Sequence, residues 1–198
     1  MHPVGPGGVT HAGIMPAPMT STRQVALLRG INVGGRSRVE MARLRALMED
    51  LGHRDVRTHL QSGNVVYTTD ATPERAAAGV EVALAERLGV RVRVLVRTRD
   101  ELAAAVAGNA LIGEATDPAR LIVLFLSAAP DPERLSGIDP DAYLPERFWV
   151  GEREIYMWCA NGVRDAQLAE MLTERRLGVT VTARNWNTVT RLLDLAGA

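Results

Sequence analysis

Lysine is absent from this chain of 198 residues, and all 23 basic side chains are arginines. They are balanced by 23 acidic side chains, so the formal net charge at pH 7 is zero. A neutral chain lacks the strong positive field of most nucleic-acid and membrane-surface binders. We interpret the missing lysine, together with abundant alanine, glycine and valine, as the codon bias of a GC-rich genome and not as an arginine-rich binding surface.

Cysteine, aromatic residues and long apolar runs are also scarce. The single cysteine, Cys159, excludes an internal disulfide. Its apolar surroundings, IYMWC, predict a buried small side chain and not a nucleophile. The longest apolar run, LIVLFL at 121–126, is far shorter than the roughly 18 residues that cross a bilayer. We therefore expect a core strand there and no membrane partner.

The N-terminal stretch MHPVGPGGVTHAGIMPAPMT is rich in proline and glycine and has no periodicity. It lacks the charged start and apolar core of a signal peptide. Residues 1–22 are therefore expected to be a disordered tail. Met19 directly precedes the first expected strand and is an alternative translation start. A cytoplasmic location follows by default.

Two segments of similar length show the same order of strand and helix patterns. In the first segment, Ser37 and Glu40 have the spacing of a capping box, which predicts a helix from Arg38. VRVRVLVR at 90–97 alternates, with valine facing inward and arginine mostly outward. The elements expected in the first segment are strand 24–31, helix 38–51, strands 56–61 and 64–69 joined through Ser62-Gly63, helix 73–88, strand 90–97 and helix 99–107.

In the second segment we expect strand 120–127, a helical turn at 131–137, a hairpin of 148–151 and 154–159, helix 165–176, strand 179–183 and a closing helix from Asn185 or Trp186. The first six elements of the first segment have the βαββαβ order of a ferredoxin-like unit. We predict an α+β protein of two ferredoxin-like subdomains, a structural duplication. The first spans 23–111, a linker spans 112–119, and the second α+β subdomain spans 120–198.

The stretch GINVGGRS, residues 30–37, matches the phosphate-loop pattern G-x-x-x-x-G-K-[ST] except that Arg36 stands in place of lysine. Its position between a buried strand and a helix would direct main-chain N–H groups at an anion. An NTPase is disfavoured, because arginine does not replace that lysine geometrically and neither candidate strand is followed directly by a magnesium-binding aspartate. A simple anion site and a structural glycine turn both stay open.

Three blocks in order, LLRGINVGGRSRVEMARLRALMEDLG, THLQSGNVVY and TARNWNTVTRLLDL, resemble an uncharacterised bacterial family, domain of unknown function 1697, with LRGINVGG as its signature. The resemblance extends from Gln24 to the C-terminus and implies a soluble α+β protein without an assigned reaction. Family members tend to carry aromatic residues at the positions of His53 and His59, so the resemblance does not support catalysis by either histidine.

Amide and guanidinium groups dominate these blocks. Such groups recognise phosphates, carboxylates and base edges, but they supply no general base or nucleophile. No paired carboxylates, Cys–His pair or metal-ligand spacing accompanies them. We predict no catalytic constellation, no metal and no cofactor. The candidate ligand-binding residues are Arg29, Asn32, Gly34, Gly35, Arg36, Gln61, Asn64, Arg184 and Asn185.

Each candidate also has a structural interpretation: Asn64 can complete a turn, Asn185 can cap the last helix, and Trp186 can belong to the core. We further expect the first and third strands to run parallel. That arrangement would separate the loop after Leu28 from Gln61–Asn64 by a strand length of roughly 20 Å.

Our leading hypothesis is a protein that binds an anionic small molecule, a nucleotide or a phosphorylated metabolite, at loop 30–37. One alternative is single-stranded RNA binding across an open sheet face, where only Tyr67 offers stacking. Another is a scaffold without a small ligand, with the hairpin FWVGEREIYMWC as its interface. A third alternative is an enzyme, in which His59, beside the segment Gln61–Asn64, would be the general base.

Overall fold

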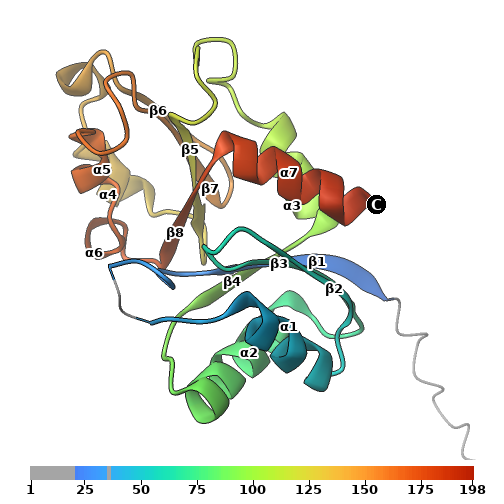
Figure 1. The fold of residues 1–198 in the computed structure, drawn as a ribbon. Helices are drawn as coiled ribbons and strands as arrows, with labels where there is room; N and C mark the ends of the chain where they lie inside the picture. The colour runs from blue at the N-terminus through green and yellow to red at the C-terminus, as the bar shows by residue number, and fades with distance from the viewer. Residues whose placement is uncertain (1–20, 35–36) are drawn as a thin grey trace, which may run out of the picture.

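The computed structural model describes residues 21–34 and 37–198. Residues 1–20 of the expected N-terminal tail, with the alternative start at Met19, lie outside the described residues, as do the candidate residues Gly35 and Arg36. The tail was expected to reach residue 22, but Thr22 begins the first strand. Two four-stranded antiparallel sheets with helices form a mixed α+β fold, as the sequence predicts (Figure 1). None of the described helices is long and apolar enough to cross a membrane.

The first sheet has the strand order β2-β3-β1-β4, and every neighbouring pair is antiparallel. Its strands are β1 (Thr22–Leu28), β2 (Arg54–His59), β3 (Asn64–Thr69) and β4 (Val94–Thr98). Two helices, α1 (Met41–Asp50) and α2 (Pro73–Leu88), cover one face. Leu44 of α1 and Val80 of α2 are fully buried there against Tyr67 of β3. Burial of these apolar side chains fixes both helices on the sheet.

The second sheet has the equivalent order β6-β7-β5-β8, again antiparallel throughout. Its strands are β5 (Leu121–Leu126), β6 (Arg147–Val150), β7 (Glu154–Trp158) and β8 (Val181–Asn185). Short helical segments cover its outer face (Figure 1). They are α4 (Pro132–Ser136), the 3-10 helix η1 (Pro140–Tyr143), α5 (Leu168–Met171) and α6 (Glu174–Leu177).

The two sheets share one core, because α3 (Arg99–Ala107) and α7 (Trp186–Gly197) lie between them (Figure 1). Leu102 of α3 and Val189 of α7 are fully buried with Val25 of β1 and Phe125 of β5. Trp186 is buried in the same cluster, which confirms the core interpretation of this residue. The first sheet is therefore covered on both faces.

Coverage of both faces of the first sheet contradicts the proposed mode of RNA binding, in which bases stack on an open sheet face. Tyr67, the expected stacking residue, is fully buried beneath α1 and α2. Base stacking needs an aromatic ring that a single strand can reach. Within the described residues the first sheet offers no open face on which Tyr67 could stack a base.

The expectation that the first and third strands run parallel is wrong. β1 and β3 are antiparallel, with Leu27 opposite Asn64. The β2–β3 hairpin reverses the chain, and the β1–α1–β2 crossover makes β2 parallel to β1, so β3 must oppose both. The loop after Leu28 and residues 61–64 therefore lie at the same end of the sheet.

Several element boundaries also differ from the sequence prediction. The helix expected from Arg38 begins at Met41, and Glu40 caps it without a side-chain hydrogen bond. Ser37 does not form the expected capping box, because the N-cap of α1 is Glu40; the backbone of Ser37 itself is left-handed at φ 50°. The strand expected from residue 90 begins at Val94. The helix expected over 165–176 is divided into α5 and α6, because Thr173 is extended.

Candidate functional site

Three sequence blocks that are far apart in the chain meet at the C-terminal end of β1. The N–H of Leu28 donates to the carbonyl of Gly63 at 2.8 Å. Asn32 Nδ2 donates to the carbonyl of Gln61 at 2.7 Å. Arg184, 156 residues from Leu28 in the sequence, reaches the same point from β8. The structure thus brings together the blocks that the sequence prediction had separated.

Arg184 is the centre of this cluster. Its Nη2 donates to the carbonyl of Leu28 at 2.8 Å and to that of Ser62 at 3.0 Å. Its Nε donates to Asn64 Oδ1, and its Nη1 donates to groups of β8 itself. Burial lowers the pKa of Arg184 to about 10, so the side chain stays charged at neutral pH. Its N–H groups therefore form hydrogen bonds between β8 and the strands and loops of the first sheet.

The candidate asparagines also make specific contacts within the protein. Asn64 is fully buried, and its Nδ2 donates to the carbonyl of His59 and to Ser62 Oγ, both at 3.0 Å. Asn185 Oδ1 accepts from the N–H of Thr188 at 3.0 Å and caps α7. These contacts give both residues structural roles of the kind the sequence allowed. Ligand binding by them stays a prediction.

Asn32 connects the β1–α1 loop to the β2–β3 loop. Its Nδ2 donates to the carbonyl of Val39 at 2.9 Å as well as to Gln61, and its Oδ1 accepts from the N–H of Val39 at 2.8 Å. Its backbone is left-handed at φ 57°, a conformation that asparagine tolerates better than most residues. Asn32 therefore ties the start of the β1–α1 loop to its end at Val39 and to the β2–β3 loop at Gln61. The side chain of Gln61 is exposed.

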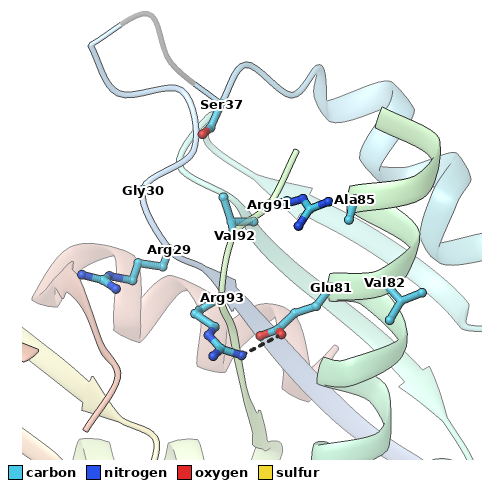
Figure 2. Close-up of a pocket in the computed structure, with 9 residues that line it drawn as sticks. All are labelled: Arg29, Gly30, Ser37, Glu81, Val82, Ala85, Arg91, Val92 and Arg93. Atoms are coloured by element: carbon cyan, nitrogen blue, oxygen red, sulfur yellow. Dashed lines mark hydrogen bonds and ion pairs between the residues drawn. The ribbon is translucent and has the colours of Figure 1, made fainter. Parts of the chain in front are cut away.

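A solvent-open cleft of about 790 Å³ borders the β1–α1 loop, α2 and the chain that leads into β4 (Figure 2). Its lining residues are Arg29, Gly30, Ser37, Glu81, Val82, Ala85, Arg91, Val92 and Arg93. Arg29 is the one candidate ligand-binding residue among them. Glu81, Arg91 and Arg93 were not predicted from the sequence as site residues. The alternation of VRVRVLVR was a usable signal, since it placed these arginines on a solvated face.

Two of the three cleft arginines are already paired. Arg93 Nη1 lies 3.3 Å from Glu81 Oε2, and Glu81 Oε1 accepts from the N–H of Val94 at 2.8 Å. Arg29 pairs with Glu174 of α6, in the other half of the chain. Figure 2 shows the three guanidinium groups pointing in different directions. Among the described residues, Arg91 forms no ion pair.

The glycines of the loop leave its main chain open. Gly30 and Gly34 have left-handed backbones, at φ 63° and 60°, and a Cβ added at either would meet no atom within 4 Å. Main-chain groups that no side chain shields can approach an anion closely. The cleft thus combines cationic side chains with an accessible main chain, which are features of anion recognition.

The cysteine and the two described histidines lie outside the lining of this cleft. Cys159 is buried, as expected, and burial raises the pKa of its thiol to about 11. Burial, followed by the charge of Arg191, lowers the pKa of His59 below its usual value. Across the described ranges, no group of three or more His, Cys, Asp or Glu residues could hold a metal ion.

The fold and the cleft define a mixed α+β protein with two antiparallel sheets and an arginine-lined surface cleft. The chain belongs to the family described as "Protein of unknown function (DUF1697)", whose sequence model matches residues 21–156. The family membership inferred from the sequence is thereby confirmed over residues 21–156, a range that does not include the third block at 182–195.

Among curated proteins, none matches this chain. A solved structure of similar fold is that of the conserved bacterial protein SP0830 from Streptococcus pneumoniae, with a TM-score of 0.71 and 22% sequence identity. The similarity covers 89% of this chain and 99% of that chain. At this identity the likeness shows the fold alone.

Proposed function

We propose that this protein binds an anionic small molecule, a nucleotide or a phosphorylated metabolite, in the cleft beside the glycine-rich loop. The observation that carries the proposal is the arrangement of Arg29, Arg91 and Arg93 around one cleft of about 790 Å³. Guanidinium groups form charge-assisted, often bidentate hydrogen bonds with phosphates and carboxylates. Glu81 is the one acidic residue among the described residues that line this cleft.

The arginines differ in how readily they can serve a ligand. Arg91 has no ion pair with the described residues, so it is the primary anion contact in this proposal. Arg29 would exchange Glu174 for the ligand, an exchange that is feasible because both side chains are partly exposed, at 45% and 37%. Arg93 is held by Glu81 and contributes mainly to the field of the cleft.

Apolar side chains favour a ligand with an organic body over a bare inorganic ion. Val82, Ala85 and Val92 line the cleft beside the arginines, and Val82 is 55% exposed. A base or a carbon skeleton could cover this surface while its phosphate lies against Arg91. A bare phosphate would leave the apolar surface exposed.

A binding role fits the cleft better than catalysis. Among the described residues its lining includes no histidine or cysteine, and both carboxylate oxygens of Glu81 are engaged, by Arg93 and by the N–H of Val94. A general base must be free to reach the proton that it takes. We therefore assign no catalytic residue to this cleft.

A thermal-shift screen tests the proposal. Residues 19–198 would be heated with sulfate, phosphate, nucleotides and phosphorylated metabolites, in parallel with Arg91→Ala and Arg36→Ala variants. A ligand at a hundred times its dissociation constant stabilises by about 2.7 kcal/mol, which corresponds to about 5–11 °C for a chain of this size. The stabilisation should vanish in Arg91→Ala.

Arg75→Ala is the matched control, because Arg75 is exposed near the N-terminus of α2 and does not line the cleft. Ligand stabilisation should persist in this variant. An Arg91→Ala protein that responds as strongly as the wild type would refute the proposed site. So would the absence of any shift with every anion in the screen.

We also infer that the two halves, 23–111 and 120–198, are copies of one ferredoxin-like unit joined by residues 112–119. The inference is supported by the equivalent strand orders, β2-β3-β1-β4 and β6-β7-β5-β8. A helix follows the last strand of each half, α3 after β4 and α7 after β8. The second copy differs by having short helical segments where the first has α1 and α2.

A further inference from the structure

A second surface, remote from the arginine-lined cleft in sequence, combines an apolar groove with the edge of a sheet. The groove has a volume of about 560 Å³ and lies between β6, α4 and η1. Pro132, Leu135 and Ile138 line one side, and Phe148 and Val150 of β6 line the other. A groove with this lining accepts apolar side chains and offers few polar groups to a soluble metabolite.

The strand beside the groove is the edge of its sheet, since β6 pairs only with β7. At the hairpin turn the N–H of Gly151 donates to the carbonyl of Glu154 at 2.8 Å. Hydrogen-bonding direction alternates along an antiparallel strand, so the main-chain groups of Phe148 and Val150 point away from β7. No other segment of the described chain bonds to them. The residues that line the groove thus also present open main-chain donors and acceptors.

The surroundings of the groove are acidic. Residues 129–152 contain six acidic residues and two arginines, a net charge of −4. Five of the six acidic residues are exposed, namely Asp131, Glu133, Asp139, Asp141 and Glu152. Within residues 21–34 and 37–198, no arginine lines the groove, whereas Glu152 does. The two arginines of this stretch are occupied: Arg147 pairs with Glu114 at 3.0 Å, and Arg134 donates to the carbonyl of Arg176 at 3.1 Å. Arg153, which follows Glu152, pairs with Glu101.

An exposed tryptophan lies on the opposite face of the same strand. Trp149 is 53% exposed, whereas Phe148 and Val150 on either side of it are partly buried toward the groove. Tryptophan is the best aromatic partner for a cation such as an arginine or lysine side chain. A strand added beside β6 would therefore meet an apolar groove on one face and a cation-binding ring on the other.

We propose that the edge of β6 binds an extended segment of a partner protein in which apolar and basic residues alternate. The segment adds a fifth strand to the second sheet through the main chain of Phe148 and Val150. Its apolar side chains enter the groove, its basic side chains lie on the other face against Trp149, and the acidic surroundings of the groove attract its net positive charge. This interaction is separate from anion binding, and neither proposal depends on the other.

Fluorescence anisotropy with synthetic peptides tests this interaction on the full chain. The probe is a labelled nine-residue peptide of alternating valine and arginine, and glutamate replaces arginine in the comparison peptide. The basic peptide should bind at least tenfold more tightly than the acidic one, and more weakly as salt rises. N-methylation of alternate peptide nitrogens should abolish binding, because it removes the donors that pair with β6.

Two protein variants locate the contact. Val150→Pro removes an edge donor without removing a β6–β7 hydrogen bond, and it should weaken peptide binding at least tenfold. The double variant Asp139→Asn and Glu152→Gln should weaken binding several-fold and reduce its salt dependence. Glu49→Gln with Glu86→Gln, two exposed positions on α1 and α2, removes the same charge from the other half and should leave binding unchanged.

The results also discriminate between other occupants. Equal affinity for the basic and acidic peptides, or unchanged binding in both groove variants, would overturn the proposal. Binding that survives N-methylation would exclude strand addition. If sedimentation shows a dimer of the unliganded chain that Val150→Pro dissociates, the occupant is a second copy and the partner-protein proposal fails.

Discussion

Arg97 and Arg184 hold equivalent positions in the two sheets, and each donates hydrogen bonds to the main chain of the opposite half. Arg97 lies opposite Val25 of β1, as Arg184 lies opposite Val123 of β5. Arg97 Nη2 donates to the carbonyl of Leu126, the last residue of β5, at 2.6 Å. The reciprocal contact of Arg184 is with Leu28, the last residue of β1.

The two arginines differ in their acidic partners. Arg97 Nε donates to the carboxylate of Glu154 at 3.1 Å, at the position where Arg184 has the neutral amide of Asn64. Glu154 is the first residue of β7, and Asn64 is the first residue of β3. Arg184 is therefore a buried cation held by neutral oxygens alone.

Replacing Arg184 is expected to destabilise the whole protein. Arg184→Ala leaves the buried acceptors at Leu28 and Asn64, and the partly buried carbonyl of Ser62, without their donor. Loss of the partner of a buried acceptor costs about 1–3 kcal/mol. Urea unfolding should show a loss of about 3 kcal/mol or more. Arg175→Ala, at an exposed position in α6, should change stability little. A similar small change for Arg184→Ala would show that the cluster does not hold the halves together.

Stability is expected to fall in mild acid because of His53. This side chain is buried, and its ring centroid lies 4.6 Å from that of Tyr67. Its Nδ1 has no hydrogen-bond partner in the described part of the chain. Burial lowers its pKa in the folded protein. In the unfolded chain the histidine pKa is about 6.5, so near and below this pH His53 binds a proton more readily in the unfolded chain than in the folded protein. Stability should be full above that pH and decrease as the pH falls below it.

Urea midpoints measured between pH 8 and pH 5 check this dependence. His53→Phe keeps an aromatic ring against Tyr67 and should reduce the loss in acid. A smaller part of the loss should persist, since the pKa of His59 is also lowered. An unchanged acid response in His53→Phe would assign the effect to other groups.

Gly63 is expected to tolerate no side chain. An added Cβ would lie 2.7 Å from Leu28 Cβ and 2.8 Å from Ile31 Cδ1, and the backbone is left-handed at φ 76°. Overpacking costs about 1–3 kcal/mol, and a left-handed alanine costs about 1–2 kcal/mol more. Gly34→Ala shares the left-handed backbone but has open space, so it should show only the second cost. Thermal unfolding of both variants measures the difference, and equal losses would contradict the close approach.

Glu174 is expected to compete with the anion for Arg29. If the cleft binds anions as proposed, Glu174→Gln should tighten binding by about two- to fivefold, the usual worth of a partly exposed ion pair. Arg29→Ala should weaken binding. Glu170→Gln removes a nearby exposed carboxylate of α5 and is the matched control. Titration calorimetry with the anion identified by the thermal screen measures all three. Tighter binding in both glutamate variants would indicate a general charge effect and not competition at Arg29.

Local sequence patterns predicted most strands and helices, because the spacing of apolar residues within a segment indicates both its secondary structure and its buried face. LIVLFL became the fully buried β5, and Trp186 opened a helix packed in the core. The alternation of residues 90–97 correctly placed Arg91 and Arg93 on the surface. It misplaced Arg97, which is 2% exposed, because the outward face of β4 meets the second sheet at that point. A single strand carries no signal for such a contact.

The composition of the candidate site depended on tertiary structure in the same way. Arg184 and Asn64 were selected from separate blocks, yet only the antiparallel pairing of β1 with β3 brings both to Leu28. In the sequence, Glu81 has the pattern of an ordinary exposed helix residue. Its contact with the N–H of Val94 exists only because α2 packs beside β4. Residue types were therefore readable from the sequence, whereas their partners required the packing of the two halves.

The shared core has a consequence for how the chain can be divided. Helices α3 and α7 pack together between the sheets, and the reciprocal arginines complete hydrogen bonding across the same boundary. Residues 112–119 join the halves covalently, but the interior is what keeps them associated. A protease cut within that segment is therefore expected to leave two fragments that stay associated and elute together in size-exclusion chromatography, because each covers the apolar core surface of the other.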